Sequence, residues 1–429
     1  MGLSAKAESS GTCGPNLKWH LTDDGVLTIT GKGEMYDYSY TPWSYDDLTR
    51  VIIGNGVTTI GKNAFVGRSS LTSVTIPNSV TTIGESAFYD CKSLTSVTIP
   101  NSVTTIGGYA FSGCSSLTSV TIPNSVTTIG EAAFRYCSHL TSVNIPNSVT
   151  TIGGWAFKYC SSLTSVTIGN SVTTIGYSAF DGCISLTSVT IPNNVTTIGD
   201  YAFSNCSSLT SVTIPNCVKT ISDNTFSGCS SLTSVNIPNS VTTIGGWAFS
   251  DCSSLTSVTI PNSVKTISDN TFSDCSSLTS VTIPNSVTTI GSEAFSGCTN
   301  LQKVYIGNSV KAIGEYAFNN CTSVTQISSE AVVPPTCESG VFFYINTSKC
   351  KLTVPKNSLD AYKQAYQWKD FLLIEESTTG ITNTVYNNAG LADVYTIDGA
   401  KRLSKASTDE INALPKGVYI VNGKKIIIK

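Results

Sequence analysis

The sequence repeats itself with a period of 23 residues from position 48 to position 323. The stretch LTSVTIPNSVTTIGESAFYDCKS at 71–93 represents the unit, and twelve such units follow one another without insertion or deletion. Large apolar residues recur at fixed places in each unit, as in chains that stack short coils on one another. A single coil buries too little apolar surface to offset the entropy of ordering its backbone, so its neighbours must supply the rest. The period therefore predicts an elongated β-rich solenoid.

Each unit contains the signals of one short strand and one tight turn. Leu71 and residues 74–76 follow the spacing L-x-x-L-x-L, and 74–76 alternate inward and outward as a strand does. Pro77 has no N–H group and ends the strand. On the return side Gly84 allows a sharp turn, and Phe88 fills the far corner of the coil.

Composition argues against two classes of protein. Only 12% of the residues are charged, the net charge is −3 and like charges do not cluster, so the field expected of a nucleic-acid binder is absent. No apolar run approaches the roughly 18 residues that a membrane span needs.

Catalytic and cofactor signals are equally weak. The two histidines, His20 and His139, lie in unrelated contexts, and carboxylates are scattered singly through the units. No Ser/His/Asp set, paired acid and base or phosphate-binding glycine loop emerges. We therefore expect no enzyme activity and no cofactor.

Eleven of the fifteen cysteines recur at 23-residue intervals from Cys91 to Cys321. Equivalent side chains in stacked coils keep their Cβ atoms about 4.8 Å apart, which exceeds the roughly 3.5–4.5 Å that a disulfide needs. The absence of C-x-x-C pairs argues against a metal site. We expect the eleven repeated cysteines to be free and buried. For Cys337 and Cys350, a disulfide between the two stays an open alternative.

One polar column follows the strands, and we call it the threonine ladder. Its members are the outward residues of successive units: Thr75, Thr98, Thr121, Asn144, Thr167, Thr190, Thr213, Asn236, Thr259, Thr282 and Tyr305. Threonine is a good, soluble strand residue, so the ladder has a purely structural explanation. The alternative is a hydroxyl-lined groove that binds protein or glycan. A regular threonine column is also a feature of ice-binding solenoids, but a curved sheet with single columns disfavours that function.

Variation between units gathers elsewhere, after the Ile-Gly pair and after Phe. Aromatic residues recur at these places, and we expect them on the return and convex side. One local patch combines aromatic and basic residues, a mixture that is enriched in contact surfaces. Its members are Arg135, Tyr136, Trp155, Lys158 and Tyr159. Packing between coils is the alternative explanation.

Four segments follow from these patterns. Residues 1–47 comprise a tail and a capping hairpin, 48–323 the repeats, 324–376 a C-terminal cap with one helix, and 377–429 a small all-β module. Trp19 and Trp43 suit a cover for the first coil, because solenoids need caps.

The unit LxxVxIPxxVxxIGxxAFxxCxx resembles the BspA-type (Treponema-type) leucine-rich repeat of bacterial surface proteins over residues 48–323. Ser222 and Ser268 depart from the pattern by replacing its glycine. The resemblance implies a right-handed, curved array with short parallel strands on its concave face. It also implies a role in adhesion to host proteins or to other cells.

The end of the chain, VYTIDG followed by LPKGVYIVNGKKIIIK, resembles the C-terminal sorting or anchoring modules of Bacteroidetes secreted proteins. This resemblance implies an extracellular or cell-surface location. The start, MGLSAKAESSG, lacks the apolar core of a signal peptide, so either the protein is cytosolic or a signal has been replaced there. The C-terminal resemblance favours the second alternative.

Two functions remain open at this point. The first is a non-enzymatic surface or secreted repeat protein that binds a host protein, a glycan or another cell, and we expect it to be a monomer. The second is a structural spacer that displays other components and has no specific ligand on the solenoid.

Overall fold

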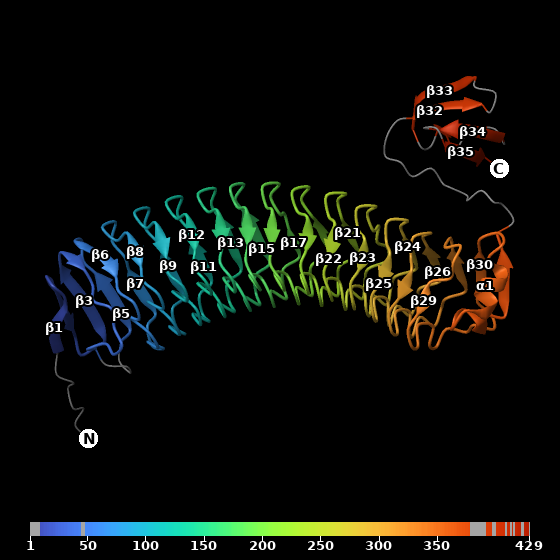
Figure 1. Ribbon diagram of the computed structural model, residues 1–429. Coiled ribbons are helices and arrows are strands. Elements are labelled where there is room, and N and C mark those ends of the chain that lie inside the picture. The colour runs from blue at the N-terminus through green and yellow to red at the C-terminus, as the bar shows by residue number, and fades with distance from the viewer. Residues whose placement is uncertain are drawn as a thin grey trace.

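The computed structural model describes residues 9–43, 48–377, 392–396, 400–407, 410–411, 414, 417–421 and 424–428. The chain winds into a parallel β-solenoid of about 15 turns with repeats of about 23 residues, which confirms the predicted fold class (Figure 1). Equivalent residues of successive coils pair in register, as Val120 does with Val97.

The L-x-x-L-x-L segments form the first ladder of strands, as predicted. Its parallel members are β5 (Arg50–Ile53), β7 (Ser73–Thr75), β9 (Ser96–Thr98), β11 (Ser119–Thr121), β13 (Ser142–Ile145), β15 (Ser165–Ile168), β17 (Ser188–Val189), β19 (Ser211–Thr213), β21 (Ser234–Asn236), β24 (Ser280–Ile283), β26 (Lys303–Ile306), β28 (Gln326–Ser329), β30 (Lys351–Val354) and β31 (Leu373–Glu376). At the N-terminal end, β1 (Ser9–Gly14), β2 (Leu17–Leu21) and β3 (Val26–Gly31) pair antiparallel, and β3 joins β5 in parallel.

A second ladder on the return side was not predicted as strands. Its members are β4 (Gly33–Glu34), β6 (Val57–Ile60), β8 (Thr82–Ile83), β10 (Thr105–Ile106), β12 (Thr128–Ile129), β14 (Thr151–Ile152), β16 (Thr174–Ile175), β18 (Thr197–Ile198), β20 (Thr220–Ile221), β22 (Thr243–Ile244), β23 (Thr266–Ile267), β25 (Thr289–Ile290), β27 (Ala312–Ile313) and β29 (Thr336–Cys337). Most are only two residues long, which is too short for alternation in the sequence to reveal them.

The turn segments form a third, irregular ladder of backbone hydrogen bonds. The N–H groups of Asn63 and Phe65 donate to the carbonyl oxygens of Glu85 and Ala87 in the next coil, at 3.0 and 2.7 Å. The same connection repeats along the array, so three sides of each coil are held by its neighbours.

The core is a continuous row of stacked rings and aliphatic side chains. The twelve phenylalanines of the units, Phe65 to Phe318, are buried, and neighbouring rings have centroids 5.1–5.7 Å apart. Trp43 stacks on Phe65 at 5.6 Å and Trp19 lies edge-on to Trp43, so the predicted pair of tryptophans covers this end of the row. At the other end Phe342 contacts Trp368.

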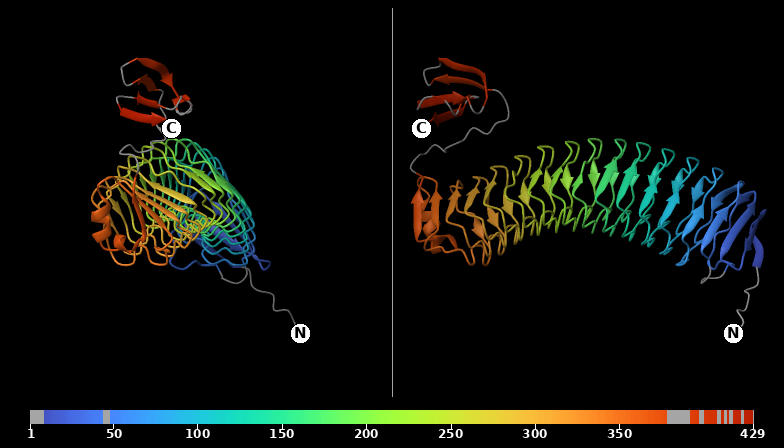
Figure 2. Two further views of the ribbon diagram at one scale, coloured as in Figure 1. Left: turned by 90° about the vertical axis from the view of Figure 1, so that its right-hand side faces the viewer. Right: turned by 180° about the vertical axis from the view of Figure 1, so that it is seen from behind.

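The array bends into an arc, and the strands form its sides instead of lining its concave face (Figures 1 and 2). The implied position of the strands is thus wrong. The Pro-Asn loops, which follow the arrowheads of the first ladder, lie along the outer edge, whereas the turn segments lie along the inner edge. In most described loops the backbone bond stays inside one coil, as from Val80 N–H to Pro77 O, whereas the N–H groups of Gly54 and Gly307 donate to Ile29 O and Ile283 O of the preceding coil. Fewer backbone bonds therefore join the coils at this edge than at the turn segments, which makes it the freer edge to spread.

After the repeats come the helix α1 (Leu359–Gln364) and the 3₁₀ turn η1 (Trp368–Asp370). Tyr362 is buried in α1, where its hydroxyl donates to Ala331 O at 2.8 Å. A separate antiparallel sheet, ordered β33-β32-β34-β35, comprises β32 (Ala392–Thr396), β33 (Lys401–Ala406), β34 (Gly417–Val421) and β35 (Lys424–Ile428).

Candidate functional site

The threonine ladder lies on the exposed side of the first ladder of strands. All its members are exposed except Tyr305, which is half-buried. Neighbouring threonines are already engaged, because Thr118 Oγ1 donates to Thr95 O at 3.2 Å and Thr164 Oγ1 to Thr141 O at 3.1 Å. No protein partner is found for the ladder hydroxyls of Thr121 and Thr167 among the described residues. These hydroxyls are therefore available to a ligand.

A second polar column beside the ladder was not singled out from the sequence. Every unit has asparagine directly after its Pro or Gly: Asn55, Asn78, Asn101, Asn124, Asn147, Asn170, Asn193, Asn216, Asn239, Asn262, Asn285 and Asn308. All twelve are exposed. Its presence in all twelve units was the signal that could have revealed this asparagine column.

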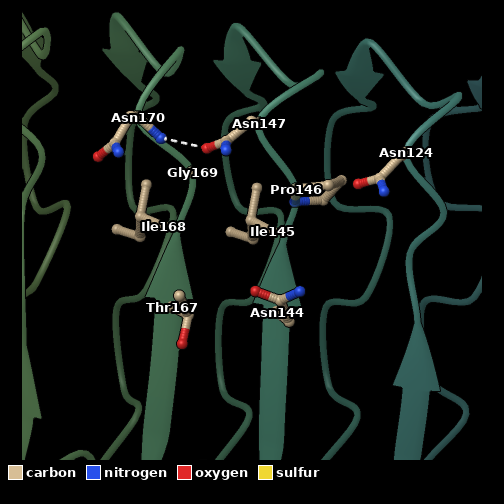
Figure 3. Close-up of a pocket in the computed structure, with 9 residues that line it drawn as sticks. All are labelled: Asn124, Asn144, Ile145, Pro146, Asn147, Thr167, Ile168, Gly169 and Asn170. Atoms are coloured by element: carbon tan, nitrogen blue, oxygen red, sulfur yellow. Dashed lines mark hydrogen bonds between the residues drawn. The ribbon is translucent and has the colours of Figure 1, made fainter.

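The two columns meet in a shallow groove of about 300 Å³ between adjacent coils (Figure 3). In Figure 3 the ladder residues Asn144 and Thr167 lie at its lower end, and asparagines of three successive coils lie at its upper end. The N–H group of Asn170 donates to Asn147 Oδ1 at 2.7 Å and fixes that amide. The full lining is Asn124, Asn144, Ile145, Pro146, Asn147, Thr167, Ile168, Gly169 and Asn170. The structure thus brings two of the predicted ladder residues into one site, while the others continue along the array.

Four members of the predicted aromatic patch form one cluster, which we call the tyrosine pair with its two cations. The rings of Tyr136 and Tyr159 stack with centroids 5.2 Å apart and are 44% and 40% exposed. The Arg135 guanidinium lies over Tyr136 at 4.6 Å, and Lys158 Nζ lies 5.0 Å from the centre of the Tyr159 ring. Lys158 is also anchored by an ion pair of 2.8 Å to the buried Asp181.

Trp155, the fifth predicted member, packs in a different row. Its ring contacts Tyr177 edge-on at 5.2 Å, and Tyr177 in turn contacts Tyr201 at 5.6 Å. The turn segments that carry both groups lie along the inner edge of the arc in Figure 1, so their expected convex position is wrong.

Both tyrosines of the pair occupy a left-handed backbone conformation, with φ of 60° each. The equivalent position, two residues after Phe, holds Gly, Asn or Asp in the other ten units: Gly67, Asp90, Gly113, Gly182, Asn205, Gly228, Asp251, Asp274, Gly297 and Asn320. These are the residues that adopt this conformation most readily, whereas a bulky side chain costs roughly 1–2 kcal/mol. Packing within the array would favour the smaller residues at this position. The presence of two tyrosines there therefore points to a role other than packing.

No group of three or more His, Cys, Asp or Glu side chains placed to hold a metal ion was found among the described residues. All fifteen cysteines are free, including Cys337 and Cys350, and only Cys217 is exposed. In the part of the chain that the structure describes, no helix is long and apolar enough to cross a membrane.

Comparison with known proteins identifies the repeats. A family model of six copies of the BspA-type leucine-rich repeat region matches residues 37–164, 156–276 and 247–372. The chain belongs to the BspA-type leucine-rich repeat family. The match confirms the resemblance of the repeats, and it does not extend to the C-terminal sheet.

The chain is also similar to solved structures of bacterial leucine-rich repeat proteins. A leucine-rich repeat protein from Eubacterium ventriosum is 28% identical, with 79% of this chain and 95% of that chain covered and a TM-score of 0.53. A leucine-rich cell surface protein from Faecalibacterium prausnitzii is 31% identical, with 76% and 96% covered and a TM-score of 0.47. A leucine-rich repeat protein from Bacteroides ovatus is 30% identical, with 68% and 93% covered and a TM-score of 0.36. No match was found among curated proteins.

Proposed function

We propose that this BspA-type repeat protein is a non-enzymatic, exported or surface-bound protein that holds a protein partner on a host or neighbouring cell. The observation that carries the proposal is the tyrosine pair with its two cations. Tyrosine, tryptophan and arginine dominate the energetic centres of protein interfaces. Here two tyrosines are exposed and stacked at positions where the backbone favours glycine or asparagine.

The cluster is also pre-organised for binding. Lys158 is fixed by Asp181, and the Tyr159 ring lies against Gly182, which leaves no room for a larger side chain there. Arg135 Nη2 donates to the Tyr136 hydroxyl at 3.1 Å. Side chains that are already ordered lose little entropy on binding, which favours affinity.

A double substitution tests the tyrosine pair without disturbing the backbone. Tyr136→Asn and Tyr159→Gly introduce residues that other units already have at this position. We expect binding to extracellular matrix proteins or whole cells to weaken at least about tenfold, because truncation of such centres costs about 2 kcal/mol or more. The unfolding midpoint should stay the same or rise, since two strained conformations are relieved.

Trp247→Asn is the matched control, because Trp247 is also exposed and left-handed but lies outside the pair. Binding should survive this change. Equal binding by the double variant and the wild type would place the partner elsewhere. A well-folded wild type that binds none of the extracellular matrix proteins or cells would favour the alternative function as a structural spacer.

The surface location rests on the family and on the C-terminal resemblance, and the 31% identical relative from Faecalibacterium prausnitzii is described as a cell surface protein. We propose that residues 377–429 act as its sorting or anchoring module. Antibody labelling of intact cells that express the full-length gene tests this location. Label that appears only after the cells are permeabilised would overturn it.

A further inference from the structure

We propose that the groove where the threonine ladder meets the asparagine column is a second binding site, specific for neutral carbohydrate. We call it the asparagine groove. It lies at the Pro-Asn loops of the outer edge, whereas the tyrosine pair lies on the turn segments of the inner edge (Figures 1 and 3). The site goes beyond the proposed protein partner and does not depend on it.

The groove forms where two departures from the repeat pattern meet. Asn144 replaces the threonine that most units have in the ladder, and Gly169 replaces proline in the very next unit. Elsewhere in the twelve units, glycine takes the place of this proline only in the first and the last, at Gly54 and Gly307. The groove is therefore a local feature of the middle of the array.

Gly169 changes the loop by bringing two backbones close together. A Cβ atom built on Gly169 would lie only 2.5 Å from Pro146 O and 2.8 Å from the Asn147 nitrogen. Without that Cβ, the Asn170 N–H group reaches Asn147 Oδ1. This bond holds one amide of the groove in a single orientation, with its NH₂ group left to donate to a ligand.

The chemistry of the lining suits sugar hydroxyls. None of the nine lining residues is charged, and four are asparagines with exposed side chains. A primary amide offers both donors and acceptors, as a vicinal pair of hydroxyls requires. Neither Asn124 nor Asn144 has a protein partner for its amide within the described chain. An anionic or cationic ligand would find no counter-charge among these residues.

A peptide fits the same place poorly. Strand β15 is paired on both sides, to β13 and β17, so no free strand edge is offered for β-addition. The apolar lining residues Ile145 and Ile168 are buried, and they leave no deep pocket for an apolar side chain. About 300 Å³ is at the lower end of ligand-site volumes, which suits one or two sugar rings at a chain end or branch.

Two substitutions restore the pattern of the other units. Asn144→Thr and Gly169→Pro introduce the residues found at most equivalent positions. The probe is a set of uncharged oligosaccharides of glucose, mannose and galactose, with sialylated and sulfated ones alongside, measured by ligand-observed NMR titration. We expect the wild type to bind at least one neutral sugar and each variant to bind it at least tenfold more weakly.

Asn236→Thr and Gly307→Pro are matched controls, because they make the same exchanges outside the groove. Both should bind like the wild type. If Gly169→Pro fails to fold, Asn144→Thr alone decides the outcome, since threonine fits the neighbouring strands. No neutral sugar bound by the wild type, a preference for acidic sugars, or unchanged binding by folded Asn144→Thr would each overturn the proposal. The double tyrosine variant should keep its sugar binding, which separates this site from the proposed protein site.

Discussion

At the scale of single residues, the cysteine of each unit has a defined hydrogen-bonding role. Cys160 Sγ donates to the carbonyl oxygen of Phe134 in the preceding coil at 3.2 Å, and the other ten thiols of the ladder make the same contact at 3.1–3.3 Å. The sequence predicts a small buried thiol at this position. It does not reveal the acceptor, which belongs to a residue 26 positions earlier.

Burial also determines how these thiols respond to pH. It raises the pKa of Cys91, Cys160 and Cys229 from the ordinary value of 9.0 to about 12. Between these values the unfolded chain loses thiol protons that the folded chain keeps, so stability must fall as the pH rises. We expect each buried thiol to make its full contribution to the free energy of unfolding below pH 9. Above pH 9 the free energy of unfolding should fall by about 1.4 kcal/mol per thiol and pH unit. Urea unfolding at pH 7.5, 9 and 10 measures this loss.

Replacing Cys160 and Cys229 by alanine provides the control, because each removed thiol should make the decline with pH less steep. In the native state only the exposed Cys217 should react quickly with a thiol reagent, whereas fifteen thiols should react after unfolding without reductant. Stability that is flat from pH 7.5 to 10 would contradict the role given to burial.

At the scale of the coil, glycine after isoleucine is required by close approach and not by an unusual backbone angle. A Cβ atom on Gly153 would lie 2.7 Å from Gly130 C and 2.8 Å from Glu131 N, both in the preceding coil. The neighbouring Gly154 has no atom nearer than 3.4 Å to its added Cβ. Ser222 and Ser268 replace this glycine in two units, and their hydroxyls donate to Ile198 O and Ile244 O at 2.8 and 2.6 Å.

These contacts predict an order of stability for three variants. Gly153→Ala should destabilise the array by about 1–3 kcal/mol, because its methyl group forces two coils apart. Gly153→Ser should cost less, since its hydroxyl gains the bond seen at Ser222. Gly154→Ala should be neutral or slightly stabilising, because the unfolded chain loses freedom and no clash arises. Thermal unfolding of the three proteins tests the order, and equal midpoints for the two alanine variants would refute it.

At the scale of the whole molecule, each coil of the array contacts mainly the coils beside it. Val166 in β15 pairs with Val143 and Val189, the equivalent residues of the adjacent coils. The stability of such an array is close to a sum of coil terms and nearest-neighbour terms. Damage to one coil should therefore remain largely local.

Val166→Asp tests this locality, because it buries an unpaired charge in a middle coil. We expect amide hydrogen exchange to accelerate most within the coils of β13, β15 and β17 and least near β3 and β30. Thr167→Asp, one residue away on the exposed side, is the control and should leave protection nearly unchanged. Uniform loss of protection from β3 to β30 would show that the array unfolds as one unit.

The sequence by itself determined the coil, since a 23-residue period with inward Leu, Val, Ile and Phe has few other ways to be buried. It also named all four residues of the tyrosine pair with its two cations, because variation stands out against near-identical units. Only the tertiary structure decided how residues from different coils meet, and it separated Trp155 from the pair and joined Asn144 to the asparagine column. The direction of curvature was likewise decided by the three ladders together. Their relative spacing depends on contacts between coils, and a repeat unit read alone does not contain those contacts.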